Sequence, residues 1–227
     1  MGKPLISDAE MRGMYSTMLR LRAAKREPAV LAGLSRAERA GVVAQPESLL
    51  AALVFQLRSS DTLVTHGNDP LPKVALSHLA LDREQVNSTG TAAECAALAT
   101  GMAMRKRNSA SHKGLLPITV ALLADYPSLA ADLPLIARHH LALLIIVQSP
   151  ADTRAATEAR NRATTVPVLP VDDSDAVAVC RVLQESLLRA RQGLGGTVLH
   201  AVRMQPAPDA VAGMEERLRR RGLLPSA

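Results

Sequence analysis

Two short, unbroken apolar runs constrain the fold of this 227-residue chain more than any other feature. They are LPITVALLA at 116–124 and LALLIIVQ at 141–148, and a helical pattern lies between them. Runs without polar alternation are typical of parallel strands that are buried on both faces. A strand, a helix and a second such strand predict a βαβ unit, and hence an α/β fold with helices on both faces of a sheet.

The first part of the chain is expected to be helical. SDAEMRGMYSTMLRLRAAKRE (7–27) begins with the capping-box pattern of Ser7 and Glu10 and predicts a long first helix. PESLLAALVFQLRSSD, with Pro46 near its start, predicts a second helix. A strand end and a loop are then expected in TLVTHGNDPLP (62–72).

The second half repeats the alternation of helices and strands. A helix rich in small residues is expected over 90–108, a helix ending at Gly193 over 176–193, and a last strand over 196–204. We therefore predict a three-layer α/β fold with a doubly wound, mostly parallel sheet, formed by a single domain. This domain is expected to cover residues 1–227, with an N-terminal helical segment (1–60) and a short C-terminal helix (213–224).

Composition narrows the function classes. The net charge is +6, but the basic residues form separate clusters, and one Phe, two Tyr and no Trp leave almost no aromatic surface for base stacking, so no nucleic-acid binding is expected. No membrane segment is expected either, because the run at 141–147 is far shorter than a spanning helix and the first residues have no continuous apolar region. We expect a cytoplasmic protein with Cys95 and Cys180 as reduced, buried thiols.

Several familiar catalytic patterns are absent or better explained by structure. The sequence has no G-x-S-x-G elbow and no Walker A motif. GLGG (193–196) follows a helix, so it is interpreted as a helix C-cap, and the adjacent His139 and His140 as residues at a helix C-terminus. Helix capping is likewise expected of the carboxylates in VDDSD (171–175), namely Asp172, Asp173 and Asp175. His66 is a candidate site residue, since it follows a strand-like segment; loop hydrogen bonding is its alternative.

With these elements in order, the chain resembles the dehydrogenase E1 component family, the α subunits of thiamine-diphosphate-dependent 2-oxo acid dehydrogenases such as pyruvate dehydrogenase. STGTAAECAALATGMAMRKR is similar to the family's small-residue interface helix. PVDDSDAVAVCRVLQESLLRARQGLGGTVLHAV is similar to its V-D-G-x-D, helix, A-R-x-G-x-G-P-x-L-I-E-A pattern. The resemblance implies a thiamine-diphosphate-binding fold, and a shared fold does not by itself imply shared chemistry.

The resemblance also implies a cofactor site, and this sequence departs from it. In the family, Mg²⁺ bridges the diphosphate to the Asp of G-D-G and to an Asn one helix later. Asp125 holds the Asp position, but Tyr126 and Pro127 follow it, and Ser149 stands where the Asn is expected. His66 is followed by Gly67 in place of the phosphate-contacting Arg. The family's Gly-His-Ser loop is replaced by QPAPDA, and His200 replaces its Glu.

We therefore expect a degenerate, non-catalytic E1α-like protein, a pseudoenzyme in which His66 and Asp125 are vestiges of a cofactor site and no cofactor binds. It would act by association, as a homodimer or as a heteromer with an E1β-like chain. The alternative is an active 2-oxo acid dehydrogenase α subunit, with thiamine diphosphate bound and Asp125 on Mg²⁺. A third hypothesis is a small α/β module that binds another anion at helix N-termini.

Overall fold

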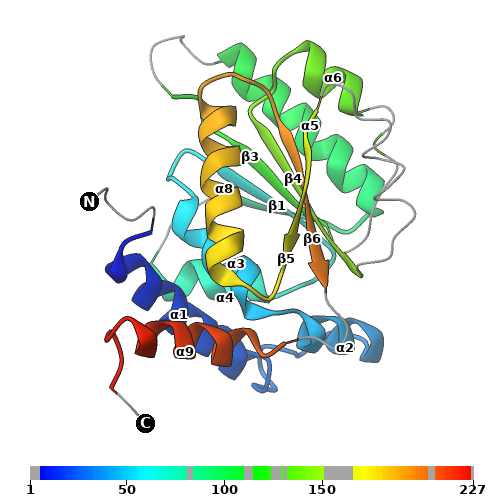
Figure 1. The fold of residues 1–227 in the computed structure, drawn as a ribbon. Coiled ribbons are helices and arrows are strands. Elements are labelled where there is room, and N and C mark those ends of the chain that lie inside the picture. Colours follow the sequence, from blue (N-terminus) through cyan, green and yellow to red (C-terminus); the bar gives the residue numbers. More distant parts are fainter. Residues whose placement is uncertain are drawn as a thin grey trace.

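A six-stranded sheet forms the centre of the molecule (Figure 1). The computed structural model describes residues 6–80, 84–109, 115–123, 129, 132–150, 166–203 and 208–225. Every strand pair in the sheet is parallel, and the strand order is β2-β1-β3-β4-β6-β5. The strands are β1 (Thr62–His66), β2 (Glu84–Ser88), β3 (Thr119–Leu123), β4 (Leu143–Pro150), β5 (Val168–Asp172) and β6 (Thr197–Arg203).

Helices cover both faces of this sheet, so the predicted three-layer α/β fold with a parallel sheet is confirmed (Figure 1). The helices α5 and α6 pack on one face, and α3 and α8 pack on the other, with α1, α4 and α9 beyond α3. The helices are α1 (Asp8–Ala24), α2 (Arg36–Ala44), α3 (Glu47–Gln56), α4 (Leu71–His78), α5 (Ala92–Ser109), α6 (Asp132–Arg138), α8 (Ala176–Arg191) and α9 (Ala210–Arg220).

Successive side chains of the central strands enter two different cores, because the side chains of a strand alternate between its faces. In β4, Ile145 and Val147 pack toward α5 and α6, whereas Leu144 and Ile146 pack toward α3 and α8. All four are fully buried. This double burial explains why the strand is apolar without polar alternation.

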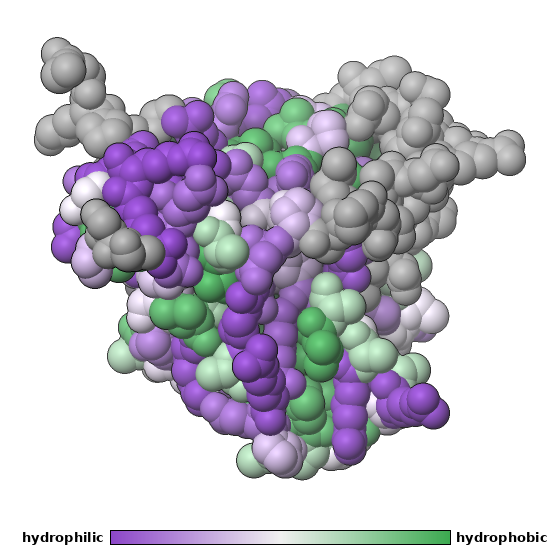
Figure 2. Space-filling view, turned by 60° about the horizontal axis from the view of Figure 1, so that its bottom comes forward, coloured by the Kyte–Doolittle hydropathy of each residue, from purple (hydrophilic) through white to green (hydrophobic). Residues whose placement is uncertain are grey.

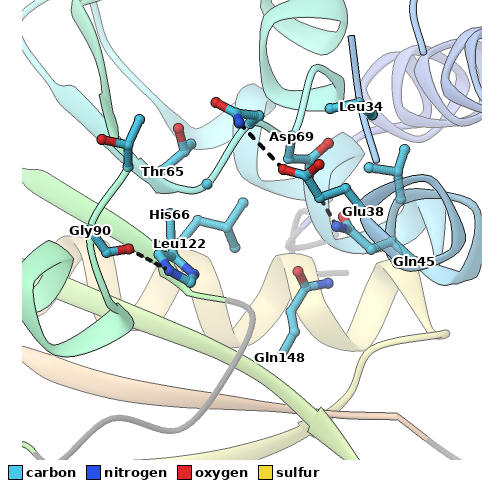
Figure 3. A pocket seen from close by; sticks show the side chains of 14 residues that line it. Leu34, Glu38, Gln45, Thr65, His66, Asp69, Gly90, Leu122 and Gln148 are labelled. Atoms are coloured by element: carbon cyan, nitrogen blue, oxygen red, sulfur yellow. Dashed lines mark hydrogen bonds between the residues drawn. The ribbon is translucent and has the colours of Figure 1, made fainter. Parts of the chain in front are cut away.

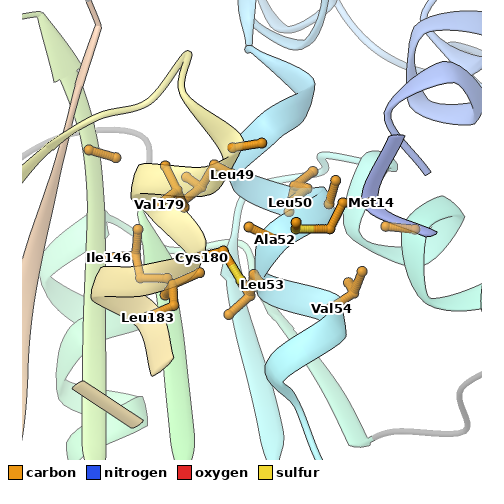
Figure 4. Packing of buried hydrophobic residues seen from close by; sticks show 14 of the residues in the cluster. Met14, Leu49, Leu50, Ala52, Leu53, Val54, Ile146, Val179, Cys180 and Leu183 are labelled. Atoms are coloured by element: carbon orange, nitrogen blue, oxygen red, sulfur yellow. The ribbon is translucent and has the colours of Figure 1, made fainter. Parts of the chain in front are cut away.

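The helix α3 is enclosed on all sides, which explains why its sequence shows no polar face. Its residues from Glu47 to Val54 are all buried. Leu49 and Leu53 lie near Val179 and Leu183 of α8, while Met14 of α1 covers the opposite side (Figure 4). The helix is therefore an inner element between the sheet layer and an outer helical layer.

Capping boxes define the starts of two N-terminal helices. The predicted box at Ser7 and Glu10 is confirmed at the start of α1. Ser35 and Glu38 form a second one at the start of α2, a helix that was not predicted although its sequence carries the same pattern. Each box satisfies backbone N–H groups that have no partner inside the helix.

Glycines close α8 and allow β6 to approach its neighbour. Gly193 has a φ of +73° directly after α8, which confirms the helix C-cap interpretation of GLGG. Gly196 lies so close to β4 that a Cβ atom there would be 2.6 Å from the carbonyl oxygen of Leu143. A glycine is therefore required at position 196 for β6 to pack against β4.

Two other expectations concern thiols and membranes. Cys95 and Cys180 are buried free thiols, as predicted, and burial raises the pKa of each to about 11. Across the described ranges, no helix is both long enough and apolar enough to cross a bilayer.

Candidate functional site

A cavity of about 360 Å³ opens at the carboxyl ends of β1, β3 and β4. In the sheet, β1 lies between β2 and β3. The chain leaves β1 toward β2 on one side and leaves β3 toward β4 on the other side, so the two connections diverge between β1 and β3. Ligands of open α/β sheets bind at such a switch point, where neighbouring connections diverge. The residues of α2 and the loop after β1 complete the walls, and Figure 2 shows hydrophilic and hydrophobic residues interspersed on the face turned forward from the bottom of Figure 1.

The predicted site residue His66 lines this cavity. It is the last residue of β1, paired with Ser88 of β2, rather than a residue of the loop that follows. Its Nε2 lies 3.0 Å from the carbonyl oxygen of Gly90, so the ring is engaged in a hydrogen bond (Figure 3). This contact corresponds to the alternative of loop hydrogen bonding, and it leaves the ring at the wall of the cavity.

Glu38 places a carboxylate on the α2 side of the cavity. Its two oxygens accept hydrogen bonds from the backbone N–H of Ser35, at 2.7 Å, and from Nδ2 of Asn68, at 3.3 Å. The Ser35 side chain and backbone, followed by Asn68, lower the pKa of this carboxyl. Glu38 therefore carries a negative charge at neutral pH.

Asp69 adds a second carboxylate from the loop after β1. It accepts a hydrogen bond from the N–H of Leu71, at 2.9 Å, and one from Nε2 of Gln45, at 3.0 Å. Burial raises the pKa of Asp69, although these two hydrogen bonds and the positive charge of Lys25 oppose that shift.

Two side-chain amides in the wall have buried atoms without hydrogen-bond partners in the described part of the chain: Oε1 of Gln45 and Nε2 of Gln148. Gln148 belongs to β4 and is only 5% exposed. In Figure 3 its side chain points into the space between His66 and Gln45. Buried polar groups without partners are uncommon, and they often mark positions where a ligand or water binds.

The described part of the cavity wall carries negative charge. Among its described lining residues are the carboxylates of Glu38 and Asp69, but no lysine and no arginine. Lys25 is nearby, but it is buried, and its Nζ donates to the backbone oxygen of Gln45 and to Glu47, the latter at 2.8 Å. The charge of Lys25 is thus balanced by Glu47.

The described wall does not fit the diphosphate group that the family resemblance implies. Phosphate sites use arginine, lysine or free backbone N–H groups, and this wall presents carboxylates. Gly67 lines the cavity at the position where the resemblance implies an arginine, and its N–H already donates to the oxygen of Ser88 at 2.8 Å. No step that depends on thiamine diphosphate can be derived from these residues.

The other residues predicted for the cofactor site are not among the described lining residues. Asp125, Tyr126 and Pro127 fall outside the described residues. Ser149 is in β4, where its backbone is paired with Val202, and its side chain is outside the described part. Searching the described residues gives no group of three or more His, Cys, Asp or Glu side chains that could hold a metal ion.

The remaining histidine candidates are not brought together at the cavity. His139 and His140 form the turn after α6, at the opposite edge of the sheet, as their interpretation as helix C-terminal residues predicts. His200 is buried in β6, where it is paired with Val147 of β4. Neither position lines the cavity.

The three aspartates of VDDSD have separate roles. Asp175 caps α8 by accepting from the N–H groups of Val177 and Ala178, as predicted. Asp172 accepts from the N–H of Ser174 and so stabilises the turn before the helix. Asp173 is not a cap but a buried carboxylate, so the capping expectation is wrong for this residue.

Comparison with known proteins gives little further information. No protein-family profile matches the chain, and no curated protein matches it. Among solved structures, the chain is similar to a 2-oxoglutarate:ferredoxin oxidoreductase from Magnetococcus marinus with 2-oxoglutarate, coenzyme A and succinyl-CoA bound. The similarity covers 69% of this chain and 27% of the oxidoreductase chain, at 12% identity and a TM-score of 0.42. The chain thus spans about a quarter of that protein.

Proposed function

We propose that this chain is a degenerate, non-catalytic E1α-like protein that does not bind thiamine diphosphate and acts by association with itself or with an E1β-like chain. The observation that carries the proposal is the acidic wall of the cavity, where Glu38 and Asp69 stand with no arginine or lysine among the described lining residues. A diphosphate is an anion, and carboxylates repel it.

Hydrogen bonding supports the same conclusion. Nε2 of Gln148 has no partner among the described residues, but two other donors at this edge are already in use, because the N–H of Gly67 donates to Ser88 and Nε2 of Gln45 donates to Asp69. A bound diphosphate would have to displace these contacts without gaining a guanidinium in return. Charge-assisted hydrogen bonds contribute about 1.5–3 kcal/mol each, so losing several of them lowers affinity by powers of ten.

Association is supported by the solvent face of α5. This face carries the exposed small residues Ala93, Ala97 and Gly101, together with Leu98, which is 41% exposed. Small side chains allow another helix to approach closely, and an exposed leucine gains from being covered. This helix is also the segment that resembles the interface helix of the E1 family.

Calorimetric titration and thermal unfolding test the loss of the cofactor. With thiamine diphosphate and Mg²⁺ in excess, the purified chain is expected to give no binding heat and a melting temperature that changes by less than about 1 °C. Asp125→Asn and the control Asp8→Asn, which removes an exposed carboxylate, should behave like the wild type.

A functional cofactor site would give the opposite pattern. The active α subunit is the alternative because the sequence retains an aspartate at the G-D-G position. If the cofactor and Mg²⁺ raise the melting temperature by several degrees, and Asp125→Asn removes that rise while Asp8→Asn does not, the proposal is wrong and the alternative is correct.

A further inference from the structure

We propose that the cavity at the carboxyl ends of β1, β3 and β4 binds a small organic cation of the alkylguanidinium type. The proposal rests on the proposed function in one respect, since it gives the same cavity a cation in place of the diphosphate. Three observations support it: the charge of the described wall, one amide atom without a partner in each of Gln45 and Gln148, and the apolar part of the lining.

The charge of the wall selects a cation. Glu38 and Asp69 lie next to each other on one side of the cavity, together with Gln45 (Figure 3). Lys25 is the basic side chain whose charge reaches Asp69, and it is bound to Glu47 behind Gln45. A cation within the cavity would therefore meet the partly buried carboxylate of Asp69, where water screens charge less than in bulk solvent, and the solvent-exposed carboxylate of Glu38.

The free amide atoms point to a ligand rich in hydrogen-bond donors. Because Nε2 of Gln45 donates to Asp69, the orientation of that amide is set, and its buried Oε1 remains as an acceptor without a partner in the described residues. Gln148 is 95% buried, since its exposed fraction is 5%, and Nε2 of its side chain has no partner there either. Nε2 is a donor, and a rotation of this amide by 180° would place its oxygen, an acceptor, at the same position.

A guanidinium group matches this set of acceptors. It is planar, permanently charged and carries several N–H donors in fixed directions, so it can reach a carboxylate and an amide oxygen at the same time. The acceptors in the wall are the oxygens of Asp69 and Gln45, joined by that of Gln148 once its amide is turned. A point-like ammonium would satisfy fewer of them together.

The rest of the lining suits a short alkyl chain. Leu34, Val42 and Leu122 contribute apolar surface to the same cavity. A volume of about 360 Å³ lies near the lower end of the range for small-molecule sites. The ligand is therefore expected to be a small molecule with a charged head and a short apolar tail.

The test uses butylguanidinium and butylurea, which share size and shape but differ in charge. Titration of the full chain, followed by calorimetry and by changes in backbone NMR shifts, is expected to show binding of butylguanidinium at least tenfold tighter than that of butylurea. Asp69→Asn and Gln148→Met should each weaken butylguanidinium binding at least tenfold. The matched control Asp8→Asn removes a carboxylate far from the cavity and should leave binding unchanged.

Three outcomes would overturn the proposal: no butylguanidinium binding, equal binding of the two compounds, or binding that Asp69→Asn leaves unaltered in a folded variant. If a variant does not fold, the comparison of the two compounds on the wild type decides alone. The thiamine diphosphate titration and the butylguanidinium titration test different proposals. Binding of thiamine diphosphate would refute the proposed function but would not change the butylguanidinium result. The absence of butylguanidinium binding would refute only the proposal of a cation site.

Discussion

Asp173 is a carboxylate held in an environment that disfavours its charge. Its side chain is 1% exposed, and Oδ2 has no hydrogen-bond partner among the described residues. Burial, with a smaller contribution from Asp172, raises the pKa of Asp173 to about 6, and Arg203 opposes the shift. The Nε atom of Arg203 lies 3.8 Å from Oδ2, which is too far for a hydrogen bond.

This raised pKa predicts a pH-dependent effect of Asp173→Asn. Since the folded protein binds the proton more tightly than the unfolded chain, Asp173 contributes its full stability below pH 4, and that contribution is lost as pH rises through about 6. At pH 8 the variant should therefore exceed the wild type in unfolding free energy by roughly 1–3 kcal/mol, with the gap closing toward pH 4. Urea unfolding at several pH values measures this difference, and a gap independent of pH would refute it.

The sequence could predict some of these residue roles and not others. Asp175 was identified as a helix cap because it lies at a strand-to-helix junction, and its partners are local, two and three residues later. The neighbouring Asp173 was assigned the same role, and this was wrong because its environment is set by Arg203, which is distant in the sequence. Local patterns contain the information for local hydrogen bonds only.

At the scale of elements, one buried ion pair joins the end of α8 to the start of the sheet. Asp61 accepts hydrogen bonds from both terminal nitrogens of Arg191, at 2.9 and 2.7 Å. It also accepts from the backbone N–H groups of Ile118 and Arg58. The side chains are 0% and 4% exposed, so the pair is almost completely removed from water.

Breaking this pair should be costly. Asp61→Asn leaves the Arg191 guanidinium buried without its counter-charge, and the unfolding free energy is expected to fall by about 3–5 kcal/mol. The matched control is Asp8→Asn, which removes an exposed partner of Arg221 and should cost at most about 1 kcal/mol. Chemical denaturation compares the two; losses of equal size would show that the buried pair has no special role.

The strands buried on both faces of the sheet could be predicted from the sequence, whereas an edge strand and a short helix could not. The strands β3, β4 and β6 were predicted because burial on both faces leaves long apolar runs. By contrast, β2 has the polar sequence EQVNS at an edge of the sheet, and α4 is a short helix with Pro72 in its first turn, so neither gives a periodic apolar signal.

The candidate site was predicted only in part for a related reason. His66 was identified because a polar residue follows an apolar strand. Glu38, Gln45, Asp69 and Gln148 were missed, since α2, the loop after β1 and the end of β4 are brought together only in the folded structure. The last of them had a usable signal, because it is a polar residue at the end of an apolar run and lies at the carboxyl end of a buried strand.

At the scale of the whole molecule, the prediction of a homodimer or heteromer can be tested through α5. Light scattering at high micromolar concentration is expected to show a dimer, or a pull-down to recover an E1β-like partner. Leu98→Lys should weaken that association because it places a charge on the proposed contact face. Leu188→Lys is the control, since this leucine is 51% exposed on α8. A clean monomer without a partner would contradict the prediction.

The enclosure of α3 has a consequence for motion. Because the sheet layer lies on one side of this helix and α1 on the other, its N–H groups cannot meet solvent unless both layers separate. The amides of α3 should then exchange with deuterium only through global unfolding, whereas those of α9 exchange through smaller openings. Native-state hydrogen exchange would reveal this as two classes of protection.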